Sequence, residues 1–314
     1  MVVPERLGDY HVNHLQEDRF DYHTEKTTMS TIKDKVWMYG AVCGAYHTPH
    51  YRLPGVSTID CATACRRYGL TKAVMDVCVK GPAYPFDAES EKLAFLDELV
   101  WTIIPSGGVV RNEEGFFDME EIIRQIQKFP NVKGVFCDDF QNRRRTLCSP
   151  EKFVELKNRV VAASPRPIDL WLVVYATDVF TERATPHHIL DYKEGVDTVS
   201  FWTWHPFHLK VLKDNLGFFM GKWPGKKVNL GLYLWDFSSG KPLDDRLMEY
   251  QLELALELLH TGVICGVTVC ASCIMGLGIK AEDIFARWLE RHGDEEINSA
   301  AIHHAETVGD NERL

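Results

Sequence analysis

The segment VKGVFCDDF, residues Val132–Phe140, decides how this chain folds. It is a short apolar run that ends on two acidic residues. Runs of this kind recur eight times along the 314 residues, at intervals of roughly 30 residues, which is the length of one strand-plus-helix unit. The eight runs are Val36–Val42, Lys72–Val79, Val100–Pro105, Val132–Phe140, Asp169–Asp178, Val196–Trp204, Lys227–Asp236 and Gly262–Ser272.

Most of these runs are continuously apolar and do not alternate between apolar and polar residues. Such runs are typical of parallel strands that are covered on both faces. Eight of them, separated by helices, predict an α/β fold consisting of a single (β/α)₈ TIM barrel, which needs about 250 residues. We assign the barrel to residues 36–292, a short N-terminal arm to 1–35 and a C-terminal tail to 293–314.

Helix boundary signals lie between the apolar runs. Ser57 and Asp60 resemble a capping box that opens a helix ending near Gly69, and Ser149 precedes a proline at the first helical position. The strongest helix pattern is Leu247–Leu259, where leucines and Met248 form one stripe. These signals support alternating strands and helices.

The composition restricts the class of partner. Hydrophobic residues make up 45% of the chain and charged residues 25%, which is ordinary for a soluble globular protein. The net charge is -10, and the only dense basic run is Arg143–Arg145, which argues against nucleic acid as a partner. No stretch of 18 apolar residues is present, so the sequence predicts no membrane span.

The nine cysteines are odd in number, and several fall inside the apolar runs. We interpret them as free thiols in a reducing compartment, which predicts a cytoplasmic protein. Residues 1–35 lack the apolar core of a signal peptide. A secreted chain whose leader has been removed is the alternative. The cysteines are Cys43, Cys61, Cys65, Cys78, Cys137, Cys148, Cys265, Cys270 and Cys273.

Acidic residues close several runs, at the end of the barrel where TIM-barrel chemistry takes place. Asp138 and Asp139 lie at the end of the fourth run, and Asp236 closes the seventh. Because side chains alternate along a strand, we expect one of Asp138 and Asp139 to face the barrel axis and the other to face a loop or the helix layer. These three residues are the candidate catalytic carboxyls, and turn-capping is the alternative role for each.

Aromatic and polar residues gather at the same strand ends. Aromatic faces stack on sugar rings, and Trp and Tyr also carry a polar group. Packing in the core is the alternative role for each ring, and turn chemistry is the alternative for the aspartates. The candidate substrate-binding residues are Asp76, Tyr175, Asp178, Trp202, Trp204, His205 and Trp235.

Two histidines follow the first run, in the segment YHTPHY (residues 46–51). Together with residues of other strand ends they offer an alternative metal site formed by His47, His50, Asp139 and His205. The His-x-His pair expected on a strand of such barrels is absent, so surface histidines are the preferred interpretation. We therefore predict no metal. No glycine motif that binds phosphate is present, so we predict no cofactor.

With acidic residues after strands four and seven and tryptophans at the mouth, the region Val36–His292 resembles a (β/α)₈ glycoside hydrolase. Many retaining members place a glutamate after each of these two strands, and this chain has Asp138, Asp139 and Asp236 instead. The chitinase pattern Asp-x-x-Asp-x-Asp-x-Glu is also not met, since Gly134–Phe140 lacks the final glutamate.

The resemblance implies an O-glycosyl hydrolase that acts on a carbohydrate through paired carboxyls, one protonated and one ionised. Two alternatives are a metal-dependent hydrolase or isomerase and a carbohydrate-binding barrel without catalysis. Arg143–Arg145 follow the acidic pair directly and would favour an anionic sugar. The sequence leaves the sugar, the linkage and the oligomeric state open.

Overall fold

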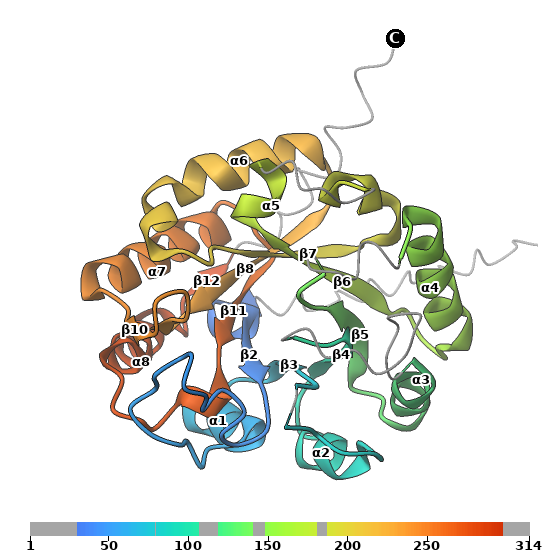
Figure 1. Cartoon of the computed structure of the whole chain (residues 1–314), viewed down its shortest axis with the longest axis horizontal. Helices are drawn as coiled ribbons and strands as arrows, with labels where there is room; N and C mark the ends of the chain where they lie inside the picture. The colour runs from blue at the N-terminus through green and yellow to red at the C-terminus, as the bar shows by residue number, and fades with distance from the viewer. Residues whose placement is uncertain (1–29, 79, 107–118, 141–147, 181–186, 298–314) are drawn as a thin grey trace, which may run out of the picture.

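Eight parallel strands close into one barrel, as the sequence predicts (Figure 1). The structure is a computed structural model that describes residues 30–78, 80–106, 119–140, 148–180 and 187–297. The first and last strands pair, with Val36 opposite Val267, and this pairing closes the barrel. In barrel order the strands are β11 (Gly266–Cys270), β2 (Val36–Gly40), β3 (Lys72–Met75), β4 (Glu98–Ile104), β5 (Val132–Cys137), β6 (Asp169–Tyr175), β7 (Thr198–Trp202) and β8 (Lys227–Tyr233).

Helices surround the barrel and cover its outer face (Figure 1). The first helix ends at Gly69 as predicted, with a φ of 64°, but its N-cap is Asp60, which accepts a hydrogen bond from the Thr63 amide, and not Ser57. Ser149 likewise caps its helix. The helices are α1 (Cys61–Tyr68), α2 (Asp87–Lys92), α3 (Met119–Lys128), α4 (Pro150–Ala163), α5 (Ala176–Phe180), α6 (Leu212–Lys222), α7 (Asp245–His260) and α8 (Lys280–His292).

Short elements complete the fold at both ends of the barrel. β1 (Ser30–Thr31), the end of the predicted arm, pairs with β12 (Glu296–Ile297) in the predicted tail. The antiparallel strands β9 (Trp235–Asp236) and β10 (Lys241–Pro242) form a small hairpin directly after β8. The short 3-10 helices are η1 (Lys33–Lys35), η3 (Ile189–Gly195), η4 (Pro206–Val211) and η5 (Ser272–Ile274).

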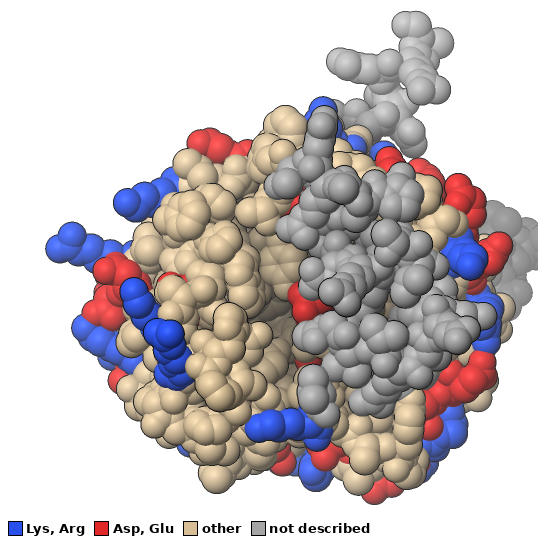
Figure 2. Space-filling view, viewed as in Figure 1, with Lys and Arg blue, Asp and Glu red and all other residues tan. Residues whose placement is uncertain are grey.

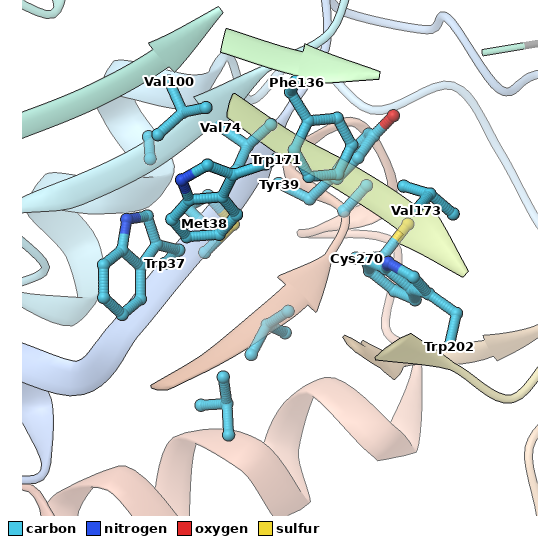
Figure 3. Close-up of a cluster of buried hydrophobic side chains, with 14 of the residues drawn as sticks. Trp37, Met38, Tyr39, Val74, Val100, Phe136, Trp171, Val173, Trp202 and Cys270 are labelled. Atoms are coloured by element: carbon cyan, nitrogen blue, oxygen red, sulfur yellow. The ribbon is translucent and has the colours of Figure 1, made fainter. Parts of the chain in front are cut away.

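Large rings fill the barrel interior (Figure 3). Trp37 and Trp171 meet edge to face with ring centroids 5.6 Å apart, and Tyr39 contacts Trp202 in the same way at 6.0 Å. Gly231 makes room for Trp202, because a Cβ atom there would lie 2.0 Å from the indole ring. Trp202, the last residue of β7, therefore packs directly against β8.

All nine cysteines are free thiols, and seven of them are buried. Cys43 is exposed and Cys265 is partly exposed. Among the described helices, none has the length and apolar character needed to cross a membrane.

Candidate active site

A pocket of about 920 Å³ opens at the carboxyl ends of the barrel strands. This volume is within the range of small-molecule sites. Figure 2 shows a hollow near the centre of this face, with acidic atoms inside it. Eight of the residues that line the pocket are aromatic: Tyr39, Tyr46, Tyr51, Tyr175, Trp202, Trp204, Tyr233 and Phe237.

Asp138 lies in the pocket wall just after β5 and is only 5% exposed. A register shift between β4 and β5 precedes it, and its amide donates to the Ile104 carbonyl oxygen at 2.8 Å. One carboxyl oxygen accepts from the Tyr39 hydroxyl at 2.5 Å, and the other accepts from the Asp139 amide at 2.6 Å. Burial, together with the negative charges of Asp139 and Asp76, raises the Asp138 pKa well above its usual range despite these bonds.

Asp139 also lines the pocket, and one of its carboxyl oxygens accepts from the Tyr175 hydroxyl at 2.9 Å. The expectation that only one of the two aspartates would face the site is therefore wrong. The alternation rule fails because β5 ends at Cys137 and Asp139 has a φ of 43°, in the left-handed region. Aspartate tolerates this conformation better than most residues.

Asp76 lies just beyond β3, completely buried beside the pocket. Its carboxyl accepts hydrogen bonds from Ser106, one from the hydroxyl at 2.5 Å and one from the amide at 3.2 Å. Burial raises the Asp76 pKa to about 6, while the Ser106 bonds and the nearby Tyr39 hydroxyl oppose this shift. Tyr39 thus lies close to two buried carboxyls, and its hydroxyl lowers the pKa of both.

The residues predicted at the end of the sixth run, in and just after β7, reach the pocket. Trp202, Trp204 and His205 all line it, and the Trp202 indole donates to the Ser200 hydroxyl at 2.8 Å. The Trp204 ring lies nearly parallel to the Phe237 ring, with an interplanar angle of 17° and centroids 6.4 Å apart. Trp204 is partly exposed in the pocket wall, whereas Trp202 is buried and only 2% exposed.

Two further residues bring charge to the pocket wall. Asp178, in α5, is buried, and its carboxyl accepts from the Tyr175 amide at 3.2 Å. The Lys80 ammonium donates to the carbonyl oxygens of Gly44 and His47, at 2.8 and 3.4 Å. Lys80 therefore ties the loop after β2 to the loop after β3 at the pocket edge.

Asp236 and Trp235 were predicted to face the site, but the structure does not place either among the residues that line the pocket. Asp236 lies in the hairpin, where its carboxyl accepts from the Ser238 hydroxyl at 2.6 Å and the Ser239 amide at 3.1 Å. The Trp235 indole is buried and donates to the Tyr51 carbonyl oxygen at 2.9 Å. The Asp236 carboxyl thus stabilises the hairpin turn, and the Trp235 indole joins the hairpin to the loop that contains Tyr51.

The alternative metal set is not assembled. His50, Asp139 and His205 line the pocket, but His47 does not, and its ring lies 3.0 Å from the Gly55 carbonyl oxygen. Over the described ranges, no three His, Cys, Asp or Glu side chains are arranged to hold a metal ion. Arg143–Arg145, which were expected to favour an anionic sugar, lie outside the described residues.

Several residues of the site were not predicted. They include Tyr39 in the first strand, Ser106 after the third, Lys80 after the second, and Cys270, which ends the last strand and lines the pocket. Tyr39 and Cys270 belong to apolar runs that looked like ordinary core. A signal was present for Phe237, because it directly follows the singled-out pair Trp235 and Asp236.

Several solved structures have a fold similar to that of this chain. The spore cortex-lytic enzyme SleL of Bacillus cereus is similar, with a TM-score of 0.50 and 13% identity over 84% of this chain and 75% of that one. A putative chitinase A from Streptomyces coelicolor has a TM-score of 0.48 and 11% identity, over 87% and 100% of the two chains. A family 18 chitinase from Crocus vernus has a TM-score of 0.45 and 12% identity, over 82% of this chain and 98% of that one.

At such identities the likeness concerns the fold alone. No protein-family profile matches the sequence, and no curated protein sequence matches it. Any assignment of chemistry therefore has to come from the side chains of the pocket.

Proposed function

We propose that this pocket binds a carbohydrate and hydrolyses a glycosidic bond. The observation that carries the proposal is the Asp138 carboxyl, which is buried, has a raised pKa and lies beside Asp139 in an aromatic-walled pocket. Aromatic walls suit the apolar faces of sugar rings. A carboxyl with a raised pKa holds its proton at higher pH than an ordinary carboxyl does, which suits proton delivery to a leaving oxygen.

The reaction requires two roles of the adjacent carboxyls. Asp138 would donate its proton to the glycosidic oxygen as the bond from that oxygen to the anomeric carbon breaks. Asp139, which is more exposed than Asp138, would accept a proton from the water that attacks the anomeric carbon. To complete the cycle, Asp139 releases the proton it gained to solvent, and Asp138 takes up a proton from solvent.

Tyr39 and Asp76 would influence the pKa of Asp138 in opposite directions. The Tyr39 hydroxyl donates to Asp138 and favours its charged form, whereas the charge of Asp76 disfavours it. A neutral Asp138 therefore depends on its burial and on the negative charges of Asp139 and Asp76. Asp236, which the sequence offered as the second carboxyl, has no part in this scheme.

Carbohydrate binding without turnover is the second candidate function. It is favoured by the hydrogen bonds of Asp138, since both carboxyl oxygens already accept from protein donors. Proton delivery would require the Tyr39 hydroxyl to turn away from Asp138. A binding barrel would need no such movement.

A panel of defined oligosaccharides tests the proposal and separates the two candidates. Binding can be followed by the fluorescence of Trp202 and Trp204, and turnover by the reducing ends released. We expect at least one glycan to bind and to be cleaved. Binding without release of reducing ends would support the second candidate, and the absence of binding to every glycan would defeat both.

A further inference from the structure

Phe207 is an aromatic residue with an unusual position. It lies in η4, the 3-10 helix that follows β7 at the mouth of the barrel, and is 64% exposed. Among the described residues it is the most exposed of the large hydrophobic side chains. A single exposed apolar side chain is common on protein surfaces. The position of this one relative to the pocket distinguishes it from the others.

The Phe207 ring is held in a defined orientation. It stacks on the His205 ring with an interplanar angle of 25° and centroids 5.4 Å apart, and it meets the His208 ring at 4.1 Å. These two contacts cover part of the phenyl ring and fix its tilt relative to both imidazoles. The high exposure of Phe207 means that much of its remaining surface is open to solvent.

His205 connects this ring to the pocket, because His205 is itself one of the residues that line the cavity. The pocket wall and the Phe207 ring are therefore continuous through one pair of stacked rings. Phe180 and Phe218 are also exposed, but their rings pack against each other at 4.9 Å. Phe207 differs from them because it stacks on His205, a residue that lines the pocket.

A flat aromatic face next to a sugar-binding pocket suits another sugar ring. A pyranose has an apolar face that stacks on such a ring, and its hydroxyls remain in water. A phenyl ring cannot donate a hydrogen bond, so this position would recognise shape and would tolerate different hydroxyl patterns. The neighbouring His205 and His208 supply polar atoms at its margin.

We propose that Phe207 forms a second sugar-binding position outside the pocket, so that the ligand is an oligosaccharide of two or more units. This inference rests on the proposed carbohydrate function of the pocket and adds the class of substrate. The first unit occupies the pocket, the chain leaves past His205, and the next unit stacks on Phe207.

The test measures affinity as a function of chain length. Tryptophan fluorescence titrations would use two homologous series, glucose to its β-1,4 tetramer and N-acetylglucosamine to its β-1,4 tetramer. For at least one series we expect the dissociation constant to fall from monomer to dimer or trimer, by roughly threefold to tenfold for one stacked ring. Phe207→Ala should remove this gain and leave the monomer affinity unchanged.

Two further variants sharpen the result. Phe207→Trp keeps a flat face and should retain the gain with chain length. Phe95→Ala is the matched control, because Phe95 is 42% exposed but lies just before β4, at the opposite end of the barrel. It should bind every oligomer as the unaltered protein does.

The outcomes distinguish this inference from the function on which it rests. If the monomer binds but longer chains bind no more tightly, or if Phe207→Ala keeps the full gain, the second position is wrong while the pocket function stands. If no member of either series binds the unaltered protein, the proposed carbohydrate function fails for these sugars. The second sugar-binding position is then overturned together with that function.

Discussion

Asp76 is the residue at which the cost of burying a carboxyl can be measured. Its pKa of about 6 in the folded protein exceeds the usual value of 3.8. The folded chain therefore holds a proton that the unfolded chain releases between about pH 4 and pH 6, so Asp76 destabilises the fold as the pH rises through this window. At low pH, where both states are protonated, this effect vanishes.

Replacing Asp76 by Asn should remove this pH dependence. Relative to the unaltered protein, we expect the free energy of unfolding of Asp76→Asn to rise by up to about 3 kcal/mol between pH 4 and pH 7. Urea unfolding at several pH values measures the difference. Because only the change with pH is interpreted, a constant loss from the altered Ser106 bonds does not matter. A difference that stays the same across the range would contradict the raised pKa.

Single residues were harder to predict than strands. The sequence located Asp138, Asp139, Trp202, Trp204 and His205 at the pocket, because the end of a strand is a position that periodicity can find. It could not show that Asp236 caps a turn, since a catalytic and a turn-capping aspartate follow a strand in the same way. Nor could it single out Tyr39, whose role depends on Asp138, 99 residues away in sequence.

At the scale of elements, the β9–β10 hairpin connects two sides of the pocket. Trp235 donates to the Tyr51 carbonyl oxygen, and the neighbouring Phe237 ring packs on Tyr51 with centroids 4.9 Å apart. Phe237 and Tyr51 both line the pocket. The hairpin after β8 thus positions the loop after β2, although Trp235 itself lies outside the cavity.

Trp235→Phe keeps a ring but removes the donor to Tyr51. We expect a stability loss of about 1 kcal/mol and, if the pocket is an active site, a higher KM with little change in kcat, because the wall loosens while the carboxyls stay in place. The matched control is Trp288→Phe, since the buried Trp288 indole nitrogen in α8 has no hydrogen-bond partner among the residues that the structure describes. A loss of kcat in Trp235→Phe, or an equal rise in KM in the control, would refute this positioning role.

The long elements were predictable for a physical reason. Each barrel strand is buried on both faces and reads as an apolar run, and helix α7 has a strong apolar stripe with Asp244 as its N-cap. The hairpin strands were not predicted as separate elements because each has only two residues. Elements that short leave no periodic pattern.

At the scale of the whole molecule, the burial of the thiols makes a prediction about the compartment. We propose a reducing, cytoplasmic environment for the nine free thiols. Denatured protein purified without reductant should titrate close to nine thiols, whereas the native protein should react rapidly at Cys43 alone, because that side chain is exposed. Fewer than two thiols in the denatured protein would indicate disulfides and an oxidising compartment.

The central claim, that Asp138 and Asp139 carry out hydrolysis in an aromatic pocket, is tested most directly by comparing three isosteric variants on one cleaved glycan. Asp138→Asn and Asp139→Asn should each lose about 10²–10⁴ in rate while binding the glycan within roughly threefold of the unaltered protein. Asp236→Asn should retain most of the rate, because its carboxyl serves the hairpin turn. Full rates in both strand-end variants, or an equal loss in Asp236→Asn, would contradict the account.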